Sequence, residues 1–133
     1  MNTYVVNGRV AKEAQLDKTQ SGTPRLTLTI ISKTHVKEGD NYLSHSVNAV
    51  FYETHAELLS TSVTKGTPLI VSGEMATRKY KGKEGEIRYY EFLRVNYFDF
   101  LESREMSALR QSNMMREQNG KEAQIGREDE FEE

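Results

Sequence analysis

The 133-residue sequence predicts a small all-β barrel with one short helix, followed by a polar, acidic extension. Five segments have the alternation or the β-branched composition of strands, and one segment between the third and the fourth has helical spacing. All seven tyrosines and four of the five phenylalanines lie before residue 104. We therefore expect one folded domain over residues 1–103 and an extension over residues 104–133.

The first two strands are predicted at residues 4–10 and 26–31. The first is rich in β-branched residues, and Gly8 within it indicates a bulge or a bend, since glycine is otherwise unfavourable in a strand. The second has Leu26, Leu28 and Ile30 at alternate positions, which is typical of a strand with one buried face.

A third strand at residues 46–52 leads into the helical segment at residues 53–64. Residues 38–41 between the second and third strands have the composition of a hairpin loop. We expect Thr54 to cap the helix, with Glu57 completing a capping box, and Lys65-Gly66 to end it.

Two further strands are predicted at residues 69–81 and 87–98, joined by a turn at residues 82–85. Strict alternation in the last strand would place Leu93, Val95 and Tyr97 on one face and Phe92, Arg94 and Asn96 on the other. Five strands with a helix between the third and fourth is the order of the OB-fold, a five-stranded Greek-key barrel.

Composition excludes several classes of function. The chain has no cysteine, which excludes thiolate metal sites and cysteine nucleophiles, and its three histidines lie ten residues apart, unlike metal-ligand motifs. No catalytic motif is present, so we expect no enzyme, no cofactor and no metal. No apolar run approaches the ~20 residues of a membrane span, and no signal peptide is visible, so we expect a cytoplasmic protein that does not contact a membrane.

Charge is distributed unevenly along the chain. The net charge is −2, from 18 basic and 20 acidic side chains. Residues 1–103 hold 13 basic and 12 acidic side chains, and residues 104–133 hold 5 and 8. This is not the strongly basic composition of a protein that binds nucleic acid by charge alone.

A family resemblance over about 100 residues rests on the order and spacing of several segments. They are Asn7-Gly8-Arg9-Val10, Ser21-Gly22-Thr23, Ala56-Glu57-Leu58 before Lys65-Gly66, Val71 to Tyr80, Lys83-Glu84-Gly85 and Arg88-Tyr89. The resemblance is to the bacterial and phage single-stranded DNA-binding proteins. It implies a homotetrameric OB-fold protein that coats single-stranded DNA with little sequence preference during replication, recombination or repair. The alternative is an OB-fold protein-interaction module with little affinity for DNA.

The resemblance also implies stacking positions for DNA bases. Family members usually use tryptophan, which this chain lacks. Tyr80 stands at one such position, His35 at a second, and either Phe51 or Tyr52 at a third. Sequence-tolerant binding needs aromatic faces for bases and cations for phosphates.

Cations around Tyr80 are the candidates for phosphate contacts. Alternation places Arg78 on the same face as Tyr80 and Lys79 on the other. The candidate set is Arg78, Lys81, Lys83 and Arg88, with Arg9 as a weaker candidate.

The extension divides into two parts. Apolar residues at helical spacing predict a helix to about Gln118, and the composition beyond Gly120 is typical of disorder. In the family an acidic tail with a terminal Pro-Phe pair docks replication and repair proteins. Here Asp129, Glu130 and Phe131 provide acid and one ring without the proline, so a solubilising tail is an equal alternative.

Overall fold

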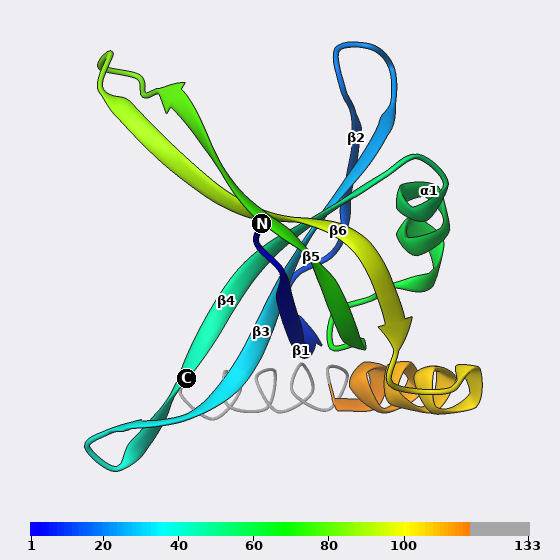
Figure 1. The fold of residues 1–133 in the computed structure, drawn as a ribbon. Coiled ribbons are helices and arrows are strands. Elements are labelled where there is room, and N and C mark those ends of the chain that lie inside the picture. Colours follow the sequence, from blue (N-terminus) through cyan, green and yellow to red (C-terminus); the bar gives the residue numbers. More distant parts are fainter. Residues whose placement is uncertain (118–133) are drawn as a thin grey trace, which may run out of the picture. The chain divides into compact units, whose positions relative to one another are not determined.

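The computed structural model describes residues 1–117 in two compact units, Met1–Leu101 and a second that begins at Glu102 (Figure 1). The first unit contains strands β1, β2, β3 and β4, helix α1, and strands β5 and β6. Their bounds are Tyr4–Val10, Gln15–Lys18, Pro24–Glu38, Asn41–Tyr52, Glu53–Ser62, Pro68–Lys81 and Ile87–Phe100, in that order.

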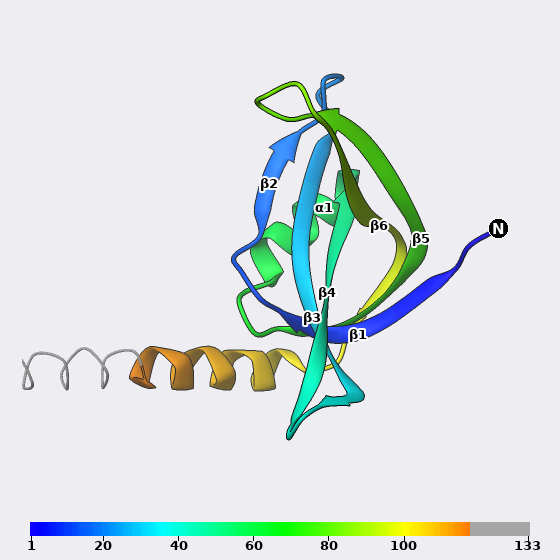
Figure 2. The ribbon, with the colours of Figure 1, turned by 90° about the vertical axis from the view of Figure 1, so that its left-hand side faces the viewer.

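The strands of the first unit form one sheet that closes on itself. Within the described residues the order is β1-β5-β6-β4-β3-β2, and β1 also pairs with β3. The β4–β6 pair is parallel and the other pairs are antiparallel. Figure 2 shows the closed wall of strands. Closure leaves few unpaired strand edges, and it confirms the predicted OB-fold barrel.

The five long strands correspond to the five predicted ones, and β2 is an addition. It pairs with β3 alone, from Gln15 opposite Thr27 to Lys18 opposite Pro24. All four of its residues are exposed. A strand without a buried face has no alternating pattern, which is why the sequence does not reveal it.

Alternate residues of the long strands fill the barrel with a single apolar core. Leu26, Leu28 and Ile30 are at most 1 % exposed, as their alternation predicts. The prediction for Tyr97 is wrong, because its side chain is 56 % exposed. The β5–β6 register shifts between Ser72 and Gly73, which marks a β-bulge. Beyond the bulge the rings that pack on the core are Phe98 and Phe100.

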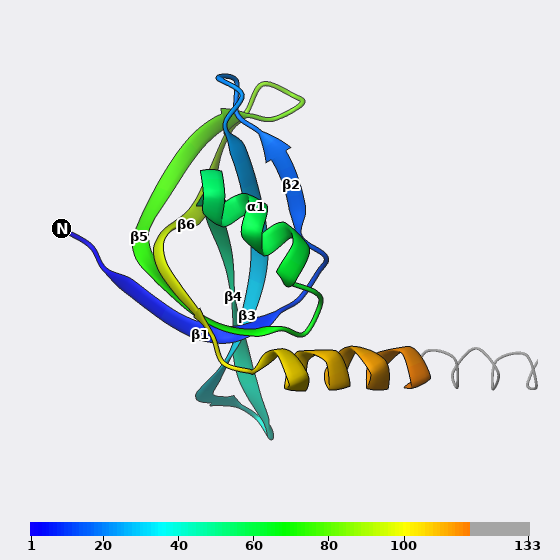
Figure 3. The same ribbon diagram turned by 90° about the vertical axis from the view of Figure 1, so that its right-hand side faces the viewer.

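Helix α1 lies against the side of the barrel beside β2 and β3 (Figure 3). Ala56 and Leu59 are its buried residues. The predicted Thr54 cap is wrong, because the helix begins at Glu53 directly after β4 and its N-cap, Tyr52, makes no side-chain capping bond. Glu53 takes a positive φ of 59° at this junction. The helix ends at Ser62, and Gly66 lies beyond it in the turn before β5.

Gly8 marks a close approach of two strands. A Cβ at this position would lie 2.3 Å from the backbone oxygen of Ile31. Directly after Gly8, β1 pairs with β3 through Arg9–Ile31 and Val10–Ile30, while its pairing with β5 continues to Arg9 opposite Pro68. The glycine therefore allows the contact that closes the barrel.

The second unit contains a helix over residues 104–117. The Oγ of Ser103 accepts a hydrogen bond from the backbone N–H of Met106 at 3.2 Å, which caps its first turn. Arg110 and Glu102 form an ion pair at 3.0 Å. Among the described residues, no helix is long and apolar enough to cross a membrane.

Candidate nucleic-acid interface

The outward-facing residues of four strands form an aromatic and basic surface. Burial of Leu26, Phe51 and Leu93 turns their neighbours outward on β3, β4 and β6. Register then aligns Arg25 with Tyr52, Arg78 with Tyr90, and Tyr80 with Arg88. We call this surface the aromatic face, and its members are Arg25, Tyr52, Arg78, Tyr80, Arg88, Tyr90, Phe92 and Arg94.

Rings and guanidinium groups on the aromatic face are already in contact. Tyr90 and Phe92 stack with their centroids 6.0 Å apart and their planes 19° apart. The guanidinium of Arg78 lies 5.2 Å from the Phe92 ring centroid, and that of Arg94 lies 5.3 Å from the Tyr52 centroid. Cation–π contacts of this kind hold both charges beside ring faces without neutralising them.

The rings of the aromatic face differ in exposure. Phe92 is covered, with 9 % of its surface exposed, whereas Tyr80 is 46 % exposed and Tyr52 and Tyr90 are intermediate. Phe92 therefore supports its neighbours, and the three tyrosines are the rings that a ligand can reach. A hollow of about 200 Å³ opens beside two of them, Tyr52 and Tyr90, and we call it the arginine hollow. It is lined by Arg25, Thr27, Val50, Tyr52, Arg78, Tyr90 and Phe92.

The β5–β6 hairpin carries most of the predicted phosphate contacts. Arg78 and Tyr80 share one face, and Lys79 contacts Tyr89 on the other, 5.9 Å from its ring centroid, as alternation predicts. Lys81 pairs opposite Ile87, and Lys83 lies exposed in the turn. Arg88 lies opposite Tyr80 and is ion-paired to Glu86 at 2.9 Å.

Phe51 is not part of the interface. It is 1 % exposed and packs edge-on against Phe98 with the ring centroids 5.7 Å apart. A ring in the core offers no face to a base, so the prediction for Phe51 is wrong. Its neighbour Tyr52 faces outward, because successive side chains of a strand point to opposite sides.

His35 lies on a different hairpin from Tyr80. It belongs to the β3–β4 arm, where its ring meets that of Tyr42 edge-on at 6.4 Å and Lys37 lies 5.1 Å from the Tyr42 centroid. Figure 1 shows that the tips of the β3–β4 and β5–β6 hairpins point in different directions. The structure thus separates His35 from the aromatic residues around Tyr80.

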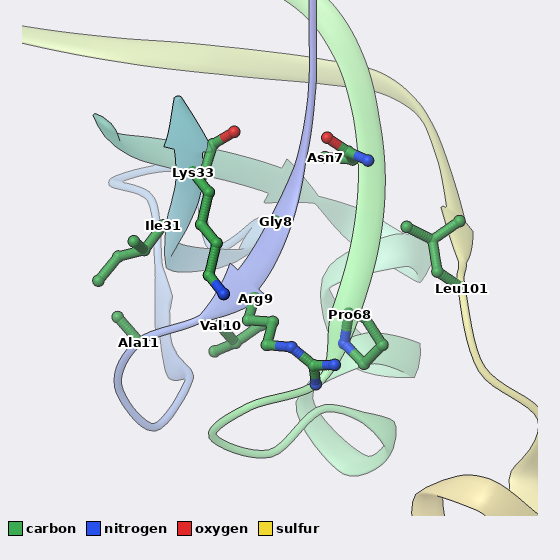
Figure 4. Close-up of a pocket in the computed structure, with 10 residues that line it drawn as sticks. Asn7, Gly8, Arg9, Val10, Ala11, Ile31, Lys33, Pro68 and Leu101 are labelled. Atoms are coloured by element: carbon green, nitrogen blue, oxygen red, sulfur yellow. The ribbon is translucent and has the colours of Figure 1, made fainter. Parts of the chain in front are cut away.

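Arg9 lines a separate pocket of about 520 Å³ along β1 (Figure 4). Lys33 from β3 also lines this pocket, over apolar residues that include Ile31, Pro68 and Leu101. Arg9 Nη1 donates a hydrogen bond to the backbone oxygen of Gly66 at 2.9 Å. The structure therefore does not bring Arg9 together with Tyr80.

Residues 1–101 match the single-strand binding protein family. The chain belongs to this family. It is 30 % identical over 115 residues to single-stranded DNA-binding protein 2 of Streptococcus agalactiae serotype III (strain NEM316), which covers 85 % of this chain and 86 % of the relative. It is also 30 % identical over 111 residues to the single-stranded DNA-binding protein of Enterococcus faecalis (strain ATCC 700802 / V583), covering 83 % of this chain and 59 % of the relative.

Several residues of the aromatic face were not among the predicted site residues. Tyr90, Phe92 and Arg94 continue the alternation that begins at Arg88, so their common face could have been found from the sequence. Alternation beside the buried Leu26 also gives the face of Arg25, but its place opposite Tyr52 depends on the β3–β4 register, which the sequence does not display. The predicted docking residues Asp129, Glu130 and Phe131 lie outside the described residues.

Proposed function

We propose that this protein binds single-stranded DNA along the aromatic face, with little sequence preference. Bases stack on Tyr80, Tyr52 and Tyr90, and phosphates contact Arg78 and Arg88, with Lys81 and Lys83 reaching the strand from the hairpin tip. The observation that carries the proposal is the half-exposed Tyr80 ring, which shares one sheet face with Arg78 and with the Arg94–Tyr52 contact.

Stacking explains how a protein of net charge −2 binds a polyanion. Each stacked base contributes about 1–3 kcal/mol, whichever base it is, because every base has a π face. The guanidinium groups add phosphate contacts, which carry no sequence information. Rings and cations on one surface therefore suit a strand of any sequence.

The assembly we propose is a homotetramer that acts in the cytoplasm where DNA strands are separated, during replication, recombination or repair. Two exposed apolar side chains support self-association: register places Val5 of β1 and Tyr97 of β6 on either side of Ser72 of β5. Val5 and Tyr97 are 60 % and 56 % exposed. Sedimentation equilibrium tests the assembly, and a tagged chain that fails to gather at stalled replication forks would argue against the role.

Docking of replication proteins on Asp129, Glu130 and Phe131 stays a proposal. Pull-down experiments with the full chain and with a chain that lacks these residues test it.

Titration of the protein with oligo-dT tests DNA binding directly. The chain has seven tyrosines and no tryptophan, so stacking should quench the tyrosine fluorescence. Tyr80→Ala should weaken binding by about 1–3 kcal/mol and leave the circular dichroism spectrum unchanged.

Tyr89→Ala is the matched control for Tyr80→Ala. Tyr89 lies on the same hairpin, is 62 % exposed and faces the opposite side. Its loss should leave the affinity unchanged. A Tyr80 variant that binds oligo-dT as tightly as the Tyr89 variant does would remove Tyr80 from the interface. If the wild-type protein bound duplex DNA of the same length as tightly as oligo-dT, a preference for single strands would be excluded.

A further inference from the structure

Asp17 of β2 and Arg25 of β3 form a bidentate ion pair. Arg25 Nε donates to Asp17 Oδ1 at 3.0 Å, and Nη2 donates to Oδ2 at 2.7 Å. This hydrogen bonding raises the pKa of Arg25, and the same pair lowers the pKa of Asp17. A guanidinium has five N–H donors, so this grip fixes its plane and leaves the Nη1 edge for another ligand.

Arg25 and Arg78 meet at the arginine hollow from opposite sides of the aromatic face. Arg25 comes from β3 and Arg78 from β5, and both line the hollow between Tyr52 and Tyr90. Within residues 1–117, Asp17 is ion-paired to Arg25 and no carboxylate is ion-paired to Arg78. Two guanidinium groups therefore line one small space, and in the described part of the chain only Arg25 of the two is ion-paired, which leaves an excess positive charge there.

A phosphate is the ligand that this arrangement fits. Guanidinium groups bind planar or tetrahedral oxyanions through parallel N–H donors, and they keep their charge at any pH in use. The rings around the hollow belong to the proposed stacking surface, so a strand lying on them would carry its backbone past the two arginines.

We propose that the arginine hollow binds one backbone phosphate of the single strand between Arg25 and Arg78, and that Asp17 is a positioning residue that holds Arg25 for this contact. The proposal rests on the proposed function and adds to it one phosphate subsite with its own residues. Arg25 acts together with Arg78 although 53 positions separate them in the chain.

Salt dependence of oligo-dT binding tests the subsite. Each phosphate contact on a single strand contributes about −0.7 to the slope of log affinity against log salt. The Arg25→Gln/Arg78→Gln double variant should therefore reduce the slope by about 0.7, and each single variant by less. A reduction of about 1.4 would show two separate phosphates, and no reduction would show that neither arginine contacts one; both results would overturn the proposal.

Lys12→Gln is the charge-matched control for each single variant. Lys12 is an exposed cation of the segment between β1 and β2, outside the hollow. Its replacement should leave the slope unchanged. If it lowered the slope as much as the double variant does, the effect would be that of net charge and the subsite would be excluded.

The oligonucleotide itself distinguishes a backbone phosphate from other ligands. Arg25→Gln should weaken oligo-dT, oligo-dC and oligo-dA by the same factor, because phosphates carry no sequence information. A loss confined to one base would show that Arg25 reads a base edge. Oligo-dT with and without a 5′-phosphate should bind alike, and a requirement for that group would assign the hollow to a strand end.

The role of Asp17 is tested in combination with Arg25. Replacing Asp17 by Asn removes the charged grip, so Arg25→Gln should have a smaller effect on affinity in an Asp17→Asn background than in the wild type. An undiminished effect would show that Arg25 needs no positioning. If wild-type protein failed to bind oligo-dT at all, the proposed function itself would fail. Normal binding with a full slope in the double variant would exclude the subsite and the proposed contact of Arg78 with a phosphate, and would leave single-strand binding in place.

Discussion

At the scale of single residues, Phe51 and Tyr52 show how strand phase assigns roles. They are adjacent aromatics at the end of β4, yet Phe51 is 1 % exposed and Tyr52 contacts Arg94 on the outer face. Residue type alone does not separate them. The difference follows from Ala49 and Val47, whose burial sets which phase of β4 faces the core.

This assignment predicts opposite effects for two matched substitutions. Phe51→Leu should lower the free energy of unfolding by about 1–2 kcal/mol, because it leaves a small void beside Phe98. Its affinity for oligo-dT should not change. Tyr52→Leu should lower the affinity and cost less stability, because the lost ring is half-buried on the surface. Urea unfolding measures the free energy of unfolding, and fluorescence titration measures the affinity for oligo-dT. If the Phe51→Leu variant were fully folded and still lost affinity, Phe51 would belong to the interface.

The candidate site was predictable where its residues lie in one regular strand. Arg78 and Tyr80 could be placed on a common face from alternation alone, and Lys79 between them contacts Tyr89 on the opposite face. The faces of Arg25 and Arg94 follow from alternation too, but their positions beside Tyr52 depend on the register between strands, which a single sequence does not display. Alternation along a strand tells which face a residue lies on. Which residues of other strands lie beside it on that face depends on the register between the strands.

At the scale of elements, the β5–β6 hairpin depends on a glycine opposite a bulge. A Cβ on Gly73 would lie 2.0 Å from the backbone oxygen of Arg94. The register shift between Ser72 and Gly73 brings the two backbones together at this point. Because the obstacle is main chain, it cannot rotate away as a side chain can.

Gly73→Ala should therefore destabilise the barrel by about 1–3 kcal/mol, the usual cost of forcing extra atoms into a packed site. Gly82→Ala is the control, because its added Cβ would meet the Glu86 carboxylate, whose flexible side chain can move aside. That variant should change stability by less than about 0.5 kcal/mol. Thermal unfolding compares the stability of the two variants. Equal melting temperatures would show that the backbone of β6 moves away at Arg94 and makes room for the added Cβ.

The elements themselves were predictable to the extent that burial imposes a pattern. The long strands bury one face and were found, with β3 and β4 extending further into their hairpin than the pattern indicated. Strand β2 buries nothing and was missed. The bulge after Val95 was also missed, because one inserted residue reverses every later side chain without altering composition.

At the scale of the whole molecule, acidic charge gathers at the end of the chain, away in sequence from the residues of the aromatic face. Residues 120–133 contain two basic and six acidic side chains, a net charge of −4. Residues 1–103 are close to neutral, with 13 basic and 12 acidic side chains. If the barrel binds DNA through its own surface, this terminal charge repels phosphates and contributes nothing to the contact.

Deleting residues 120–133 should therefore leave the affinity for oligo-dT equal or slightly higher, with the gain largest at low salt, where screening is weakest. A full-length variant with the six acids and the two basic residues of this segment changed to Gln or Asn provides the control, because it removes the same net charge of −4 and keeps the chain length. Both variants should bind alike if charge is the cause. Loss of affinity in the truncated chain, with normal binding by the neutralised one, would show that the segment contacts DNA itself, and the interface would then extend beyond the barrel.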